Sequence, residues 1–96
     1  MGSRPDELIL IPNPSVVSRR VQDEVVLVHL ETNSIFALNA TAARFWELIE
    51  AGCSRAEAEA QLAEIFEVEA AELNREVDEC VKNLVDEGLV ETAQRK

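Results

Sequence analysis

The hydrophobic pattern of this chain changes its period once along its 96 residues, and the change falls at Asn39. Before that point, short runs of Val, Leu and Ile separated by polar residues predict strands over 15–21, 24–30 and 35–38. After it, apolar residues return every three or four positions, which is typical of helices. Strands followed by helices predict an α+β domain.

The predicted strands are joined by short polar segments that favour turns. Gln22 and Asp23 separate the first two strands and predict a hairpin, and the polar run 31–34 has side chains that bond nearby backbone groups. The three strands are therefore expected to form a small antiparallel meander. The last strand is then either an edge of the sheet or one side of a groove.

Three helices are expected after Asn39. Ser54 and Glu57 form a capping box at the start of the second helix, and Gly88 supplies a left-handed stop after the third. Phe45 and Trp46 return at helical spacing in the first helix and are expected to anchor the core. The predicted helices cover 40–51, 54–66 and 70–87.

All three prolines lie in the first fourteen residues. Because proline has no amide donor, we expect an extended lead-in over 1–14, with ordered structure beginning after Pro14. The folded domain is then expected over 15–91, with a flexible polar tail over 92–96. A short extended piece over 89–91 would form a wing beside the last two helices, which predicts a winged helix-turn-helix layout.

The charge of the chain limits its partners. Nineteen acidic residues against nine basic ones give a formal net charge of −10, which repels phosphate backbones. Nucleic acid and anionic membrane surfaces are therefore not expected as partners. The same charge fits either a basic partner or a role in solubility, and the charge by itself does not choose between them.

The reactive residue types do not form a catalytic or metal-binding pattern. His29 is the only histidine, and Cys53 and Cys80 lack the spacing of a redox or zinc motif. We therefore expect no enzyme activity and no cofactor, and we interpret the cysteines as free thiols of a cytoplasmic protein. The chain also has no apolar run long enough to span a membrane.

The surface between the third strand and the third helix is the candidate binding site. An extended peptide can add to an unpaired strand edge, with pockets for alternate side chains giving specificity. Val81 and Val85 widen the apolar stripe of the third helix on one side, and they are either groove residues or core residues under the wing. The candidate peptide-binding residues are Ser34, Ile35, Phe36, Ala37 and Leu38 on the strand, and Asn74, Val77, Asp78, Val81 and Val85 on the helix.

Several segments resemble the PqqD-like family of leader-recognition domains, which serve pathways for ribosomally made, modified peptides. The main ones are the apolar run 25–28 and the segment 35–49, with its Leu-Asn junction, small-residue turn and aromatic helix. The Ser54 helix, the acidic link 67–69 and the closing Gly-Leu-Val of 88–90 resemble the family in order and spacing.

The resemblance covers about 16–91 and implies that a leader peptide binds as an extra strand between the third strand and the third helix. The segments 16–19 and 30–32 look most like the stand-alone proteins of lasso peptide pathways. That likeness implies a precursor leader as ligand, and as partner a separate leader peptidase or another modifying enzyme. The chain itself would recruit the leader and cleave no bond.

Two alternatives stay open, and so does the oligomeric state. A winged-helix transcription regulator would insert its third helix into a DNA major groove, although acidic residues outnumber basic ones on that helix. A structural subunit of a complex would bind a folded partner and no leader. A free strand edge can also pair with a second copy, so a homodimer is possible.

Overall fold

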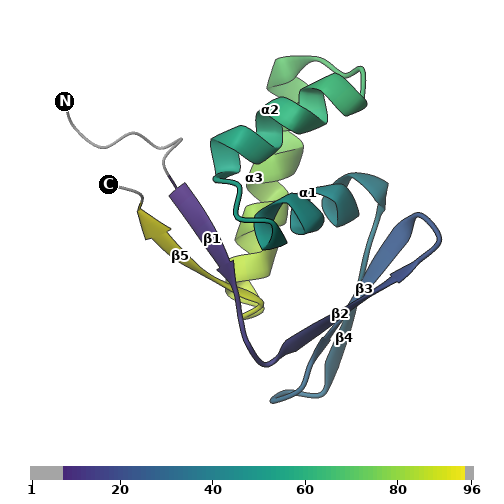
Figure 1. Ribbon diagram of the computed structural model, residues 1–96, viewed down its shortest axis with the longest axis vertical. Helices are drawn as coiled ribbons and strands as arrows, with labels where there is room; N and C mark the ends of the chain where they lie inside the picture. Colours follow the sequence, from purple (N-terminus) through teal and green to yellow (C-terminus); the bar gives the residue numbers. More distant parts are fainter. Residues whose placement is uncertain (1–7, 95–96) are drawn as a thin grey trace.

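The computed structural model describes residues 8–94 and shows a sheet below, helices above and a strand pair to one side (Figure 1). The predicted α+β layout, with a three-stranded antiparallel sheet followed by three helices, is confirmed. The elements of this range are β1 (Leu8–Pro12), β2 (Val16–Val21), β3 (Glu24–His29), β4 (Ser34–Leu38), α1 (Ala40–Glu50), α2 (Arg55–Ile65), α3 (Ala70–Asp86) and β5 (Val90–Gln94).

The sheet has the strand order β2-β3-β4, so β3 is central and β4 pairs on one side only. Both connections use a residue with positive φ, Gln22 at 57° and Asn33 at 58°. Asn tolerates this left-handed conformation because its short side chain bonds locally. The expected meander is therefore formed with tight turns at the predicted places.

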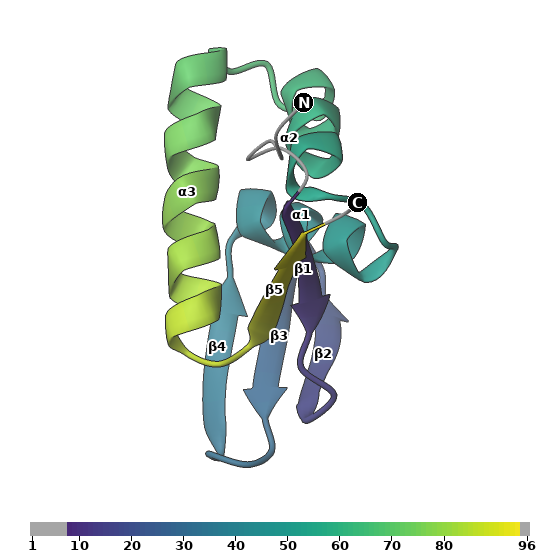
Figure 2. The same ribbon diagram turned by 90° about the vertical axis from the view of Figure 1, so that its left-hand side faces the viewer.

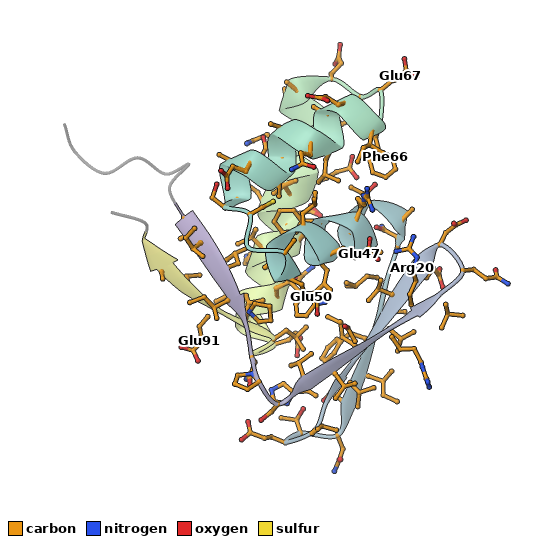
Figure 3. The ribbon with its side chains drawn as sticks, viewed as in Figure 1. Arg20, Glu47, Glu50, Phe66, Glu67 and Glu91 are labelled. Carbon is orange, nitrogen blue, oxygen red and sulfur yellow. The ribbon has the colours of Figure 1, made fainter. Side chains whose placement is uncertain are left out.

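The inner face of the sheet supplies part of the core. Val25 and Leu27 of β3 are buried against the helices, whereas Val26 and Val28, which alternate with them, are only half-buried. This alternation follows from the two-residue period of a strand. Outside the core, Arg20 of β2 forms an ion pair with Glu47 of α1 and ties the sheet to the helix above it (Figure 3).

The helix boundaries follow from their caps. Asn39 accepts a hydrogen bond from the backbone amide of Ala42 at 2.9 Å, and Ser54 and Glu57 form the expected capping box. After α3, Gly88 takes a φ of +70°. The backbone amide of Leu89 then donates to the carbonyl of Leu84 at 2.9 Å. This arrangement satisfies the last carbonyls of the helix and turns the chain sharply into β5.

The core lies where α1 meets the sheet and the other two helices. Phe45 and Trp46 are both 1% exposed and form its centre, as their spacing predicts. Leu62 of α2 and Leu73 of α3 close it from above, and Leu10 of β1 closes it from the side. The core is otherwise aliphatic, since few aromatic residues are available.

The ends of the domain differ from the expectation. Leu8–Pro12 is not an isolated lead-in, because it pairs antiparallel with Val90–Gln94 along its whole length. The boundaries at 15 and 91 are therefore wrong for the described residues, and residues 1–7 and 95–96 lie outside them. Pro12 is the last residue of the paired segment, opposite Val90, and Pro14 follows it, so neither proline interrupts the pairing. Because the two strands are some eighty residues apart, no local signal marks their pairing.

Cys53 and Cys80 are both free thiols. Within residues 8–94, no helix is long and apolar enough to cross a membrane. The same residues contain no group of three His, Cys, Asp or Glu side chains that is placed to hold a metal ion.

Candidate functional site

A cleft with a volume of about 540 Å³ lies between β4 and α3 and reaches down to α1. Figure 2 shows that α3 and β4 lie on the same side of the molecule. The strand and the start of α1 contribute Ile35, Phe36, Ala37, Leu38, Asn39, Thr41, Ala42 and Phe45. The helix and the turn after it contribute Glu76, Val77, Glu79, Cys80, Asn83, Leu84, Glu87 and Leu89.

One wall of the cleft is the free edge of β4. The strand pairs with β3 on its other side, so its outer backbone groups have no strand partner in the described part of the chain. Phe36 and Leu38 are half-buried and pack against the core, whereas Ile35 is 70% exposed on the opposite face. The edge is therefore open to an added strand whose side chains would alternate in the same way.

The floor of the cleft is apolar and uncharged. Phe45, Val77 and Leu84 are buried residues that the cleft shares with the core. Cys80 lies among them, and desolvation by burial raises the pKa of its thiol to about 11. The thiol is consequently protonated at neutral pH and behaves as a small hydrophobic group.

The rim formed by α3 is acidic. Glu76, Glu79 and Glu87 are exposed and line the cleft together with Asn83, and no Lys or Arg lines it. None of these carboxylates takes part in an ion pair found among residues 8–94. We call this side of the helix the β4 flank, defined by Glu76, Glu79, Asn83 and Glu87.

Another side of α3 faces α2, and we call it the α2 flank, defined by Asn74 and Asp78. Asn74 donates hydrogen bonds to both carboxylate oxygens of Glu59, at 3.3 and 3.0 Å, and Arg55 pairs with Asp78. A second cavity of about 560 Å³ lies here between the two helices. It is lined by Arg55, Ala56, Glu59, Ala60, Ala63, Ala70, Leu73, Asn74 and Asp78.

The structure brings together only part of the predicted site. Of the ten candidates, Ile35, Phe36, Ala37, Leu38 and Val77 line the cleft. Ser34 belongs to β4 but does not line it. Asn74, Asp78, Val81 and Val85 do not line the cleft: Asn74 and Asp78 line the cavity between α2 and α3, and Val81 and Val85 line neither.

Hydrophobicity did not identify the helix side of the cleft because the apolar stripe of a helix has two borders, and only one of them faces β4. Val81 and Val85 mark one border by hydrophobicity, yet Val81 packs against the core and Val85 is 42% exposed outside the cleft. The border that faces β4 is polar, so hydrophobicity does not reveal it. Its signal is the recurrence of Glu76, Glu79, Asn83 and Glu87 at steps of three and four.

A sequence profile described as coenzyme PQQ synthesis protein D (PqqD) matches residues 24–90. A comparison with curated proteins gives no match.

Two solved structures are similar over most of their length. One is described as TbiB1 in complex with the TbiA(beta) leader peptide; it is 31% identical, covers 84% of this chain and 94% of its own, and has a TM-score of 0.80. The other is described as lasso peptide synthetase B1 complexed with the leader peptide, with 25% identity, 88% and 98% coverage, and a TM-score of 0.75.

These findings agree with the resemblance carried by the segments 25–28 and 35–49. The profile covers the sheet from β3 onward and all three helices, and so includes β4, α1 and α3, which line the cleft. Since sequence and fold point to the same relatives, this chain belongs to the PqqD family.

Proposed function

We propose that this protein binds the leader segment of a ribosomally made precursor peptide as an extra strand against β4. The observation that carries the proposal is the free edge of β4 beside an apolar cleft. A strand edge supplies hydrogen bonds that demand little of the peptide sequence, and a cleft beside it supplies side-chain pockets. Both similar solved structures are described as complexes with a leader peptide.

Two parts of the cleft would contact the leader in different ways. The backbone of Ser34–Leu38 would bond the main chain of the leader. Every second leader side chain would then point inward to Val77, Cys80 and Leu84, which form the apolar floor. Burial of these inward side chains would supply affinity, and their size and shape would set specificity.

We propose that the protein breaks no bond itself and hands the leader to a separate leader peptidase or another modifying enzyme. Among residues 8–94, no His, Lys or Arg lines the cleft beside its carboxylates, and burial raises the pKa of the Cys80 thiol to about 11. The similarity to lasso peptide synthetase B1 supports a place in a lasso peptide pathway. The two free thiols favour a cytoplasmic location.

A titration of labelled TbiA(beta) leader peptide, followed by fluorescence anisotropy, tests the proposal. Saturable binding is expected, and a labelled DNA duplex at the same salt concentration is expected not to bind. Binding of DNA without peptide would favour the regulator instead. Light scattering during the titration shows whether β4 pairs with a second copy before peptide fills its edge.

Two matched variants locate the binding site. Ala42 and Ala56 are both half-buried near the start of a helix, but Ala42 lines the β4 cleft and Ala56 lines the cavity beside α2. Ala42→Phe fills the cleft and should weaken leader binding at least about tenfold, or roughly 1.4 kcal/mol. Ala56→Phe should leave the affinity unchanged. The reverse result, with both variants folded by circular dichroism, would place the peptide beside α2.

A further inference from the structure

The connection between β1 and β2 is a tight turn that begins at Asn13 (Figure 1). The backbone amide of Val16 donates to the carbonyl of Asn13 at 2.9 Å. Asn in the first position of such a turn, followed by Pro14 in the second, is typical. The side-chain oxygen of Asn13 also accepts from the backbone amide of Ser15 at 2.8 Å. The turn therefore fixes the direction in which the Asn13 side chain points.

The side chain of Asn13 reaches the turn that ends α3. Its Nδ2 donates to the carbonyl of Gly88 at 2.9 Å, and the residues are 75 positions apart in the sequence. The backbone amide of Asn13 donates to the carbonyl of Leu89, also at 2.9 Å. We call this pair of hydrogen bonds the corner tie, defined by Asn13, Gly88 and Leu89. The corner tie joins the β1–β2 turn to the end of α3.

The corner tie attaches to the wall of the cleft itself. Leu84, Glu87 and Leu89 line the cleft beside β4, and Gly88 lies between the last two of them. Gly88 also lies against the sheet, because a Cβ atom added to it would be 3.6 Å from Nε2 of His29 in β3. The end of α3 is thus placed between Asn13 on one side and the central strand on another.

The corner tie supplies a directional restraint that the cleft otherwise lacks. Among residues 8–94, no hydrogen bond or ion pair joins α3 to β4, and the side chains of Asn74 and Asp78 bond to α2 instead. Where the two walls meet, Val77, Leu84 and Phe36 share the apolar core. Apolar burial is non-directional, whereas a hydrogen bond depends on distance and angle. The position of the last turn of α3 therefore depends on Asn13.

From this geometry we infer that Asn13 is a positioning residue for leader binding. Through the corner tie it holds the end of α3 at the distance from β4 that an added strand requires. The inference rests on the proposed function, because it concerns the same cleft. It extends the site to a residue that does not line the cleft and lies outside residues 24–90, which the PqqD profile matches. A leader that fills the cleft stabilises the corner tie in return, since such coupling is reciprocal.

Two substitutions at one position test the inference. Asn13→Ala removes both side-chain hydrogen bonds, whereas Asn13→Asp keeps the acceptor for Ser15 and loses the donor for Gly88. Each should weaken binding of labelled TbiA(beta) leader peptide about threefold to tenfold in the anisotropy titration, the range expected for one hydrogen bond. The matched control is Asn74→Ala, which frees α3 from Glu59 beside α2 and should keep the affinity within about twofold.

The Asp variant separates the corner tie from the local turn. Loss of affinity in both Asn13 variants and not in the control, with all three folded by circular dichroism, supports the inference. Normal binding by Asn13→Asp would show that only the turn matters and would overturn it. Unchanged affinity in both Asn13 variants, or an equal loss in Asn74→Ala, would overturn it as well.

Hydrogen exchange followed by NMR tests the same coupling without a substitution. The backbone amides of Asn13 and Leu89 should exchange at least about threefold more slowly when the leader saturates the protein. The control is the amide of Phe66, which ends α2 and donates to the carbonyl of Leu62 at 2.8 Å. It should slow less than the other two. Equal slowing at all three amides, or no slowing, would contradict the inference.

Failure of the inference and failure of the proposed function give different results in the titration. Equal leader binding by the unmodified protein and both Asn13 variants overturns the inference and leaves leader binding intact. If the unmodified protein does not bind the leader, the proposed function itself is wrong.

Discussion

The two flanks of α3 differ although they belong to one helix and border cavities of similar size, about 540 and 560 Å³. On the α2 flank, Asn74 and Asp78 are engaged by Glu59 and Arg55, so polar groups of two helices satisfy one another. On the β4 flank the polar groups face a cleft and a free strand edge. The two cavities therefore differ in how far the protein's own polar groups pair around them, although their volumes are similar.

The largest effect is expected at Leu84, which the cleft beside β4 shares with the core. Leu84→Ala removes a side chain that is 2% exposed and should lower the free energy of unfolding by about 2–5 kcal/mol. Val85→Ala, at a side chain of α3 that is 42% exposed and lines neither cavity, should change it by less than about 0.5 kcal/mol. Urea denaturation measures both. Equal losses of unfolding free energy in the two variants would mean that Leu84 and Val85 are buried alike, which would contradict the difference in exposure described above.

A second prediction concerns the Cys80 thiol at the floor of the cleft. The pKa of Cys80 is raised from 9.0 to about 11 by burial. At pH 8 it should therefore react with iodoacetamide on the order of a hundredfold more slowly than an unperturbed thiol, because the thiolate is the nucleophile. The variant Cys53→Ser leaves Cys80 as the only cysteine, so that mass spectrometry follows a single site.

The same shift gives the sign of a pH effect on stability. The pKa of Cys80 is higher in the folded protein than in the unfolded chain. The contribution of its protonated thiol to the free energy of unfolding is therefore complete below about pH 9 and is lost as the pH rises to about 11. Cys80→Ala should remove this part of the pH dependence. Bound leader should slow alkylation further, and fast alkylation that leader does not affect would contradict the position of Cys80 in the cleft.

The smallest effect is expected at Arg55, the cation of the α2 flank. Arg55→Ala leaves Glu59 and Asp78 without their ion pairs and should cost about 1 kcal/mol of stability, less at high salt. Leader affinity should stay within about twofold, because electrostatics at this flank does not reach the cleft. Thermal unfolding and the anisotropy titration are the measurements. Arg44→Ala, which removes only a pair with Glu47, is the control.

The sequence predicts the fold well wherever the signal is local. The hairpin at Gln22, the capping box at Ser54 and the stop at Gly88 each depend on a few adjacent residues, and each is found at its expected place. The pairing of β1 with β5 was not predictable in this way. Its strands lie at opposite ends of the sequence, and the prolines near β1 suggested a segment without partners.

The candidate site was predictable on its strand side and not on its helix side. The segment 35–38 is short, apolar and followed directly by a helix, which correctly indicates a strand at the edge of a small sheet. For α3, the hydrophobic stripe identifies the buried face through Leu73, Val77 and Leu84. It does not tell which border of that face meets β4 and which meets α2.

The sequence by itself determined the period of each element, the caps that begin and end the helices, and the membership of the PqqD family. These properties follow from the order of neighbouring residues. Only the tertiary structure decided that Glu76 and Glu79 border the cleft while Asn74 and Asp78 face another helix. The reason is that the rotation of a helix against its neighbours is fixed by how all the buried side chains pack together, which no single segment contains.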